Sequence, residues 1–115
     1  MGWKVMPPTD ENLVVTAIFD GFLDANEGAA SAAAFRAAFR DQPLRVVWDV
    51  TKMAGFAGEA RNAWAEAVWP LRRQISHVKI IGARGMVRIG AIFLAMLLGK
   101  PYEFVNADAA TRHQS

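Results

Sequence analysis

Two spacings of apolar residues alternate along this chain. Short runs rich in β-branched and aromatic residues are typical of strands, whereas segments whose apolar residues recur every three or four positions are typical of helices. Read in order, the two patterns predict β-β-α-β-α-β-α-β. Because strands that alternate with helices pair in parallel through right-handed crossovers, we expect one α/β domain with a mixed, mostly parallel sheet flanked by helices.

The expected domain spans residues 1–105, and residues 106–115 are predicted to be a polar C-terminal tail. A short polar turn separates the first two strands, which predicts an antiparallel hairpin. The strands are expected at Trp3–Met6, Leu13–Phe19, Leu44–Val50, Val78–Ala83 and Tyr102–Val105, and the helices at Asp24–Arg40, Glu59–Ile75 and Met86–Leu98.

Residues that interrupt strands and helices mark several of these boundaries. Asp20-Gly21 is expected to end the second strand. Asp24 or Asn26 is expected to cap the first helix, because both side chains accept hydrogen bonds from the first helical turn. Pro70 lacks a backbone N–H, so the second helix should lose its regular form just before it.

The run Leu44–Val50 is expected at the centre of the sheet, followed by a glycine-containing loop, Thr51–Gly58. In open α/β sheets, ligands and partners meet the carboxyl ends of the strands. Exposed methionine and phenylalanine suit adaptable apolar docking, so we expect this loop to bind a partner protein. The predicted contact residues are Thr51, Lys52, Met53, Gly55 and Phe56; the alternative is that Met53 and Phe56 only fill the end of the sheet.

Asp49 is the most suggestive acidic residue, because it stands at the end of the central strand. We expect its carboxylate to accept hydrogen bonds from the amides that follow, rather than to act as a catalytic acid or base. General acid–base catalysis needs a positioned partner group, and the sequence indicates none. The sequence therefore predicts a protein that is not an enzyme and has no catalytic residues.

The helix Met86–Leu98 is apolar nearly all round after Arg88. A helix on one face of a sheet buries one stripe, here expected to be Ile89, Phe93, Met96 and Leu97. The remaining apolar surface needs a cover, either a neighbouring helix or a second copy in a homodimer, with an apolar ligand as the third alternative. The residues expected in self-association are Ile92, Met96 and Leu98.

Composition and motifs narrow the chemistry further. The chain has no cysteine, which excludes disulfides and thiolate chemistry. His77 and His113 each lack companion ligands at metal spacing, so no metal and no cofactor is expected. The turn before the third helix is a candidate anion site with Arg84 and Arg88, because backbone amides at a helix start attract anions. An ordinary strand-to-helix turn is the alternative.

Charge is unevenly spread, although the net charge is only +2. Residues 1–57 hold five basic and seven acidic side chains, a balance of −2, and residues 58–115 hold eight and four, a balance of +4. No dense basic run with interleaved aromatics indicates nucleic-acid binding. The longest uncharged apolar run, Ile89–Gly99, is shorter than the roughly 20 residues needed to span a bilayer, so we expect a cytoplasmic protein without a membrane span.

Several segments in this order are similar to a known group of domains. They are the hairpin Trp3–Phe19, the strand Val46–Val50, the aromatic helix segment Asn62–Trp64 and the strand Val78–Ala83. Together they resemble bacterial SpoIIAA-like domains of the STAS/SEC14 type over roughly residues 3–105. The resemblance implies an α/β fold with a mixed sheet flanked by helices, and a regulatory role through contacts with another protein.

Anti-sigma-factor antagonists of the wider STAS group carry a phosphorylatable serine in an Asp-Ser-Ser-Gly-like turn after the central strand. The matching segment here, Thr51–Gly58, has no serine, and Thr51 lies too early to replace it. The resulting hypothesis is a non-enzymatic interaction module that docks an unidentified protein through this segment without the phosphoserine switch. A binder of an apolar or anionic small molecule, such as a lipid, is the alternative that the SEC14 part of the resemblance raises.

Overall fold

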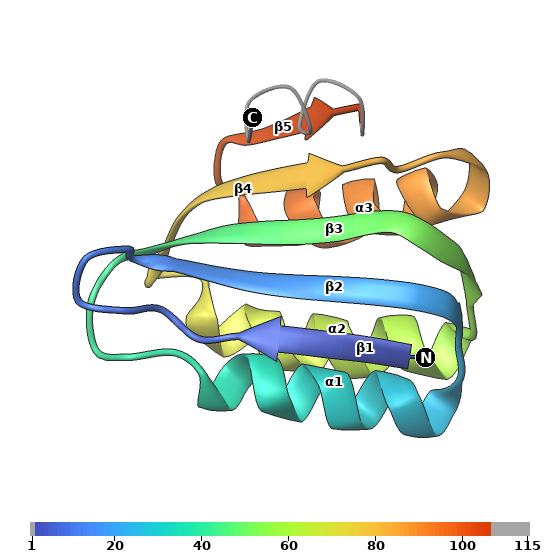
Figure 1. Cartoon of the computed structure of the whole chain (residues 1–115), viewed down its shortest axis with the longest axis horizontal. Coiled ribbons are helices and arrows are strands. Elements are labelled where there is room, and N and C mark those ends of the chain that lie inside the picture. Colours follow the sequence, from blue (N-terminus) through green and yellow to red (C-terminus); the bar gives the residue numbers. More distant parts are fainter. Residues whose placement is uncertain (1, 107–115) are drawn as a thin grey trace.

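The computed structural model describes residues 2–106, so all but the first residue of the predicted tail lies outside the described residues (Figure 1). The predicted order β-β-α-β-α-β-α-β is confirmed. The strands are β1 (Gly2–Met6), β2 (Val14–Leu23), β3 (Leu44–Phe56), β4 (Ile75–Ile81) and β5 (Tyr102–Val105); the helices are α1 (Ala25–Ala37), α2 (Gly58–Val68) and α3 (Gly85–Leu98), with a short 3-10 helix, η1 (Trp69–Leu71).

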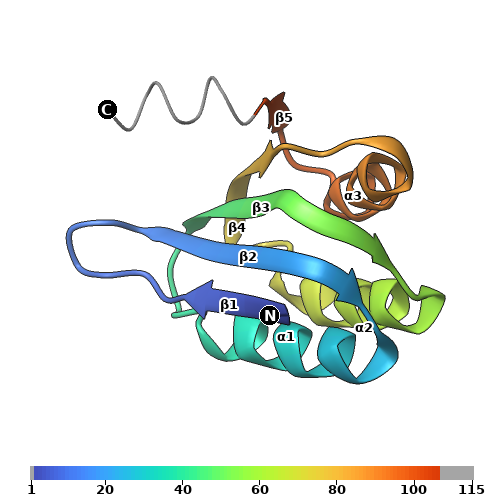
Figure 2. The same cartoon turned by 45° about the vertical axis from the view of Figure 1, so that its right-hand side comes forward.

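The five strands follow one another across a single sheet in the order β1-β2-β3-β4-β5. The first pair is antiparallel, as the hairpin predicts, and the other three pairs are parallel. Right-handed crossovers between adjacent parallel strands place every connecting helix on the same face. Figures 1 and 2 show α1, α2 and α3 on one side of the sheet. Within residues 2–106, the helices therefore cover one face and leave the other uncovered.

Burial along β3 alternates in step with this arrangement. Val46, Trp48 and Val50 point toward the helices and are buried, whereas Arg45 and Val47 lie on the uncovered face and are more accessible. Side chains of successive strand residues point to opposite faces, so this alternation is expected of a sheet covered on one side. The core is the single layer between the sheet and the three helices.

An aromatic cluster fills the middle of that layer. The Trp64 ring on α2 lies 4.8 Å from Phe35 on α1 and meets Trp48 on β3 edge-on at 6.0 Å, measured between ring centroids. The Trp64 indole N–H donates to the hydroxyl of Ser31 at 2.9 Å, and that hydroxyl donates to the Gly28 carbonyl at 3.1 Å. Each polar group of Trp64 and Ser31 thus has a partner, which is what burial requires.

Helix α1 begins as predicted and packs closely on α2. The Asp24 carboxylate accepts the Glu27 backbone N–H at 2.8 Å, which confirms Asp24 as the N-cap. Gly28 lies directly against Ala60 of α2, where a Cβ atom added to Gly28 would come within 2.5 Å of the Ala60 Cα. The small residues of α1 therefore let the two helices approach further than larger side chains would allow.

Several of the expected boundaries are wrong. The second strand does not end at Asp20-Gly21 but continues to Leu23, with shifts in its register against β3 at that point. Ile75 was expected in the second helix, yet it begins β4 and pairs with Leu44. Pro70 ends the regular helix as expected, and an isolated apolar residue such as Ile75 fits a helical stripe and a buried strand equally well.

The contact between Gly28 and Ala60 predicts a stability effect. Gly28→Ala should lower the free energy of unfolding by about 1–3 kcal/mol in urea titrations, because the new methyl group forces the two helices apart. The matched control is Gly58→Ala in the first turn of α2, where an added Cβ meets nothing within 4 Å. That control should change stability by less than about 1 kcal/mol. Equal losses for the two variants would contradict the close packing of α1 on α2.

Candidate functional site

The segment that the sequence predicts to be a loop is the second half of a long strand. β3 runs on through Thr51 to Phe56, and its last residues pair with β2, Gly55 beside Phe22 and Phe56 beside Leu23. The prediction missed this because β2 also continues past its expected end, which gives the glycine-containing segment a partner. The pairing of β3 with β4 stops earlier, at Asp49 and Ile81.

Asp49 holds the start of this segment. One carboxylate oxygen accepts the Thr51 backbone N–H at 3.1 Å and the Thr51 hydroxyl at 2.7 Å. The expected hydrogen bond to a following amide is therefore confirmed, although that amide belongs to a strand. Thr51 also lies against Gly82, whose positive φ of 74° and lack of a side chain suit this close approach. The Thr51 side chain thus serves the fold at this point.

Met53 and Phe56 line an apolar cavity between the sheet, α2 and α3. Its volume is about 60 Å³, and it is open on one side. Helix α2 supplies Ala60, Arg61 and Trp64 to its wall, and α3 supplies Val87, Gly90, Ala91 and Leu94. Of the residues predicted to bind a partner, these two come together at one concavity, whereas Lys52 is exposed on the strand beside them.

Gly90 makes room for the Phe56 ring at the edge of this cavity. A Cβ atom added to Gly90 would lie 2.5 Å from Cζ of Phe56, so the ring rests on the bare backbone of α3. On the α2 side, the Arg61 guanidinium lies 5.1 Å from the centre of the Phe93 ring. An exposed cation and two aromatic rings therefore border the apolar interior.

Trp48 brings an unsatisfied donor to the cavity wall. The residue is 3% exposed, and among the described residues its indole N–H has no hydrogen-bond acceptor. Leaving a buried donor without a partner costs about 1–3 kcal/mol. Sequence reasoning identified Trp48 only as part of a strand, because nothing in a residue pattern shows whether a buried N–H finds an acceptor.

Arg84 and Arg88 meet at a second, more polar depression. It lies at the carboxyl ends of the strands beside the first turn of α3, has a volume of about 560 Å³ and is also lined by Gly82 and Phe104. The Arg88 guanidinium lies over the Phe104 ring, 3.9 Å from its centre. The structure therefore brings the two predicted arginines to one place, and anion binding there stays a prediction.

The buried stripe of α3 is the reverse of the expected one. Val87, Ala91, Ala95 and Leu98 face the sheet, while Ile89, Phe93 and Met96 are exposed. Leu98 is only 4% exposed, so it belongs to the core and not to a self-association surface; Met96 is exposed and Ile92 is half-buried. Where nearly every position is apolar, the helical period alone does not select the buried face, and here Gly90, Ala91 and Ala95 allow α3 to lie close to the sheet.

Comparisons with known proteins show what fold this is. No protein-family model and no curated protein matches the chain. One similar solved structure is an uncharacterized protein of the DUF3478 family from Shewanella loihica PV-4, which has a SpoIIAA-like fold. The two align with a TM-score of 0.70 at 13% identity, and the alignment covers 90% of this chain and 85% of that one. The anti-sigma factor antagonist SpoIIAA in its unphosphorylated form aligns with a TM-score of 0.52 at 11% identity, covering 98% and 97%. The chain therefore has the SpoIIAA-like fold that its sequence predicts.

The hydrogen bonds of Asp49 predict a second stability effect. Asp49→Ala should lower the free energy of unfolding by about 1–3 kcal/mol, because the Thr51 N–H and hydroxyl lose their acceptor in a half-buried position. The control is Asp20→Ala on β2, an exposed carboxylate whose removal should cost less than about 0.5 kcal/mol. If Asp49→Ala unfolds at the same urea concentration as the unmodified protein, these bonds do not hold the segment.

Proposed function

We propose that this SpoIIAA-like domain is a non-enzymatic interaction module that docks a partner protein at the second half of β3. The partner inserts one aliphatic side chain into the cavity behind Met53 and Phe56. The observation that supports this proposal is the meeting of these two residues with Arg61 around an apolar concavity that is open on one side.

The size and lining of the cavity suit a single anchor side chain. A cavity of 150 Å³ holds benzene, so about 60 Å³ has room for about two or three non-hydrogen atoms, which is the tip of a leucine or methionine. Binding energy in protein interfaces concentrates in such filled pockets surrounded by a rim that excludes water. Met53 can adjust its flexible side chain to the inserted group, and Arg61, which lines the cavity, supplies charge at its border.

The fold supports a role through protein contacts, because SpoIIAA is named an anti-sigma factor antagonist. The segment from Thr51 to Gly58 contains no serine, and Ala57 occupies the N-cap of α2. Our proposal therefore includes no serine phosphorylation where β3 meets α2.

A small apolar molecule in the same cavity is the second candidate. The apolar lining of the cavity favours it, because small-molecule sites are concave and lined mostly by apolar and aromatic side chains. Native mass spectrometry of the protein purified from its own cells separates the two candidates. A bound small molecule of constant mass supports the second, and an apo protein that retains its partner supports the first.

Substitutions at the cavity test the docking proposal. Proteins that co-purify with the unmodified chain are identified, and each is then purified and its Kd measured directly. For a genuine partner, Phe56→Ala and Met53→Ala should each weaken binding by about 30-fold, the effect expected of a central interface residue. The controls Met6→Ala and Leu13→Ala remove exposed apolar side chains elsewhere and should leave the Kd unchanged. Unaltered binding by both cavity variants would show that the partner docks somewhere else.

A further inference from the structure

The outer face of α3 carries a continuous apolar stripe that no described residue covers. Four large side chains follow one another at three- and four-residue steps, which places them on one side of the helix. They are Met86, Ile89, Phe93 and Met96, and they are 67%, 59%, 45% and 68% exposed. Isolated exposed apolar residues are ordinary, but a contiguous row of them marks an interaction surface.

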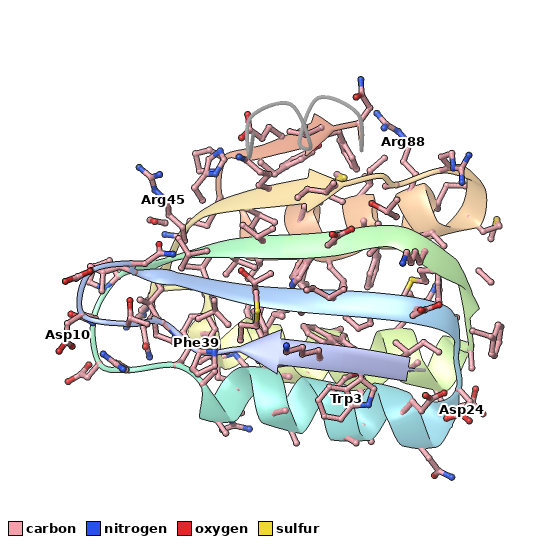
Figure 3. The ribbon with its side chains drawn as sticks, viewed as in Figure 1. Trp3, Asp10, Asp24, Phe39, Arg45 and Arg88 are labelled. Carbon is pink, nitrogen blue, oxygen red and sulfur yellow. The ribbon has the colours of Figure 1, made fainter. Side chains whose placement is uncertain are left out.

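Basic residues border this stripe. Arg61 approaches it from α2, with its guanidinium over the Phe93 ring, and Arg88 borders the β5 side through its contact with Phe104. Figure 3 shows the Arg88 side chain directed outward from the ribbon. Arg84 precedes the first turn and Lys100 follows the last, whereas the helix itself, Gly85–Leu98, contains no acidic residue.

This charge pattern argues against a second copy of the chain as the cover. A two-fold contact along α3 would place arginines and lysines of one helix against those of the other. Neither helix would supply an acidic side chain to neutralise them, and like charges brought together across an interface cost several kcal/mol. The cover is expected to be anionic as well as apolar.

The shape of the surface favours a membrane over a partner helix. Recognition of an amphipathic helix needs a hydrophobic groove, whereas the stripe runs along the convex side of α3. Figure 2 shows α3 at the end of the helical layer away from α1. A helix that lies in a lipid interface presents large apolar residues on one side with arginine and lysine beside them. None of the helices in residues 2–106 is long and apolar enough to cross a bilayer, so the contact lies in the plane of the surface.

We propose that the outer face of α3 binds the surface of an anionic membrane. Met86, Ile89, Phe93 and Met96 enter the boundary between headgroups and acyl chains, and the surrounding bases contact anionic headgroups. The stripe extends about 15 Å along the helix, from Met86 to Met96, and over that length it lies parallel to the membrane. This surface meets the border of the cavity only at Phe93 and Arg61, and the cavity itself, behind Met53 and Phe56, lies on the inner side of α3. Substitutions at Ile89 and Met96, which do not line the cavity, therefore test the membrane contact apart from the docking proposal.

Vesicle sedimentation tests the membrane contact. The full chain is mixed with vesicles of phosphatidylcholine alone or with about 30 mol% phosphatidylglycerol, at about 50 mM and about 500 mM NaCl. We expect binding to the anionic vesicles that weakens at the higher salt concentration, and little binding to phosphatidylcholine alone. Arg84→Gln with Arg88→Gln should lower the partition coefficient about 25-fold, at about fivefold for each base.

Substituting the stripe tests the apolar part without altering charge. Ile89→Gln with Met96→Gln should lower the partition coefficient by about tenfold or more, because both side chains are exposed and enter the lipid. The control pair Met6→Gln with Leu13→Gln removes two other exposed apolar groups, near β1, and should leave binding unchanged. Circular dichroism confirms that each variant is folded.

Three outcomes overturn the proposal. They are an unmodified chain that does not sediment with anionic vesicles, equal sedimentation with both lipid compositions, and stripe variants that bind as well as the unmodified chain. A dimer in light scattering that Ile89→Gln with Met96→Gln dissociates, in a protein that binds no vesicles, would instead assign the stripe to a second copy. If the same double substitution instead abolishes binding of a purified partner protein, and the protein binds no vesicles, the stripe is the site for that partner.

Discussion

The placement of the three helices on one face of the sheet follows from the order of the strands. Because each parallel strand lies beside the previous one in sequence, the right-handed crossovers carry all three helices to the same face. The helices then share the width of one small sheet, and they fit only where their contacts are made by small residues. Gly28 against Ala60 joins α1 to α2, and Gly90 beneath Phe56 joins α3 to the end of β3.

The same crowding explains why one apolar side of α3 remains exposed. Gly90, Ala91 and Ala95 approach the sheet together with Val87 and Leu98, whereas Met86, Ile89, Phe93 and Met96 are left on the outside. The cavity and the exposed stripe are therefore on opposite sides of one helix. One is concave and partly enclosed, with an unpaired indole donor in its wall; the other is convex and bordered by bases. Different chemistry on the two sides leaves room for two occupants at once.

Local patterns predicted the elements well, and failed where an outcome depended on residues far apart in the sequence. The Asp24 cap, the effect of Pro70 and the bonds of Asp49 are decided within a few residues, and all three are as expected. By contrast, the segment from Thr51 to Phe56 became strand because β2, some thirty residues earlier, extends to pair with it.

Only part of the candidate site could be predicted from the sequence. Met53 and Phe56 were predicted as contact residues from their type and place, but the cavity between them depends on how α2 and α3 settle against the sheet. The buried face of α3 was unpredictable for a related reason, since periodicity selects a stripe only when the other face is polar. The unpaired N–H of Trp48 is a fact about neighbouring atoms, and no residue pattern carries it.

The uncovered face of the sheet has a consequence for how so short a chain remains folded. Parallel sheets almost always have helices on both faces, and here the second layer is absent from residues 2–106. Lysines stand beside the aliphatic residues instead, Lys4 next to Ile18 and Lys79 next to Val47 in the pairing register. A lysine can lay its four methylene groups over a neighbouring apolar side chain while its ammonium stays in water. Lysine at these two positions is therefore suited to shielding apolar side chains on the uncovered face without a second helical layer.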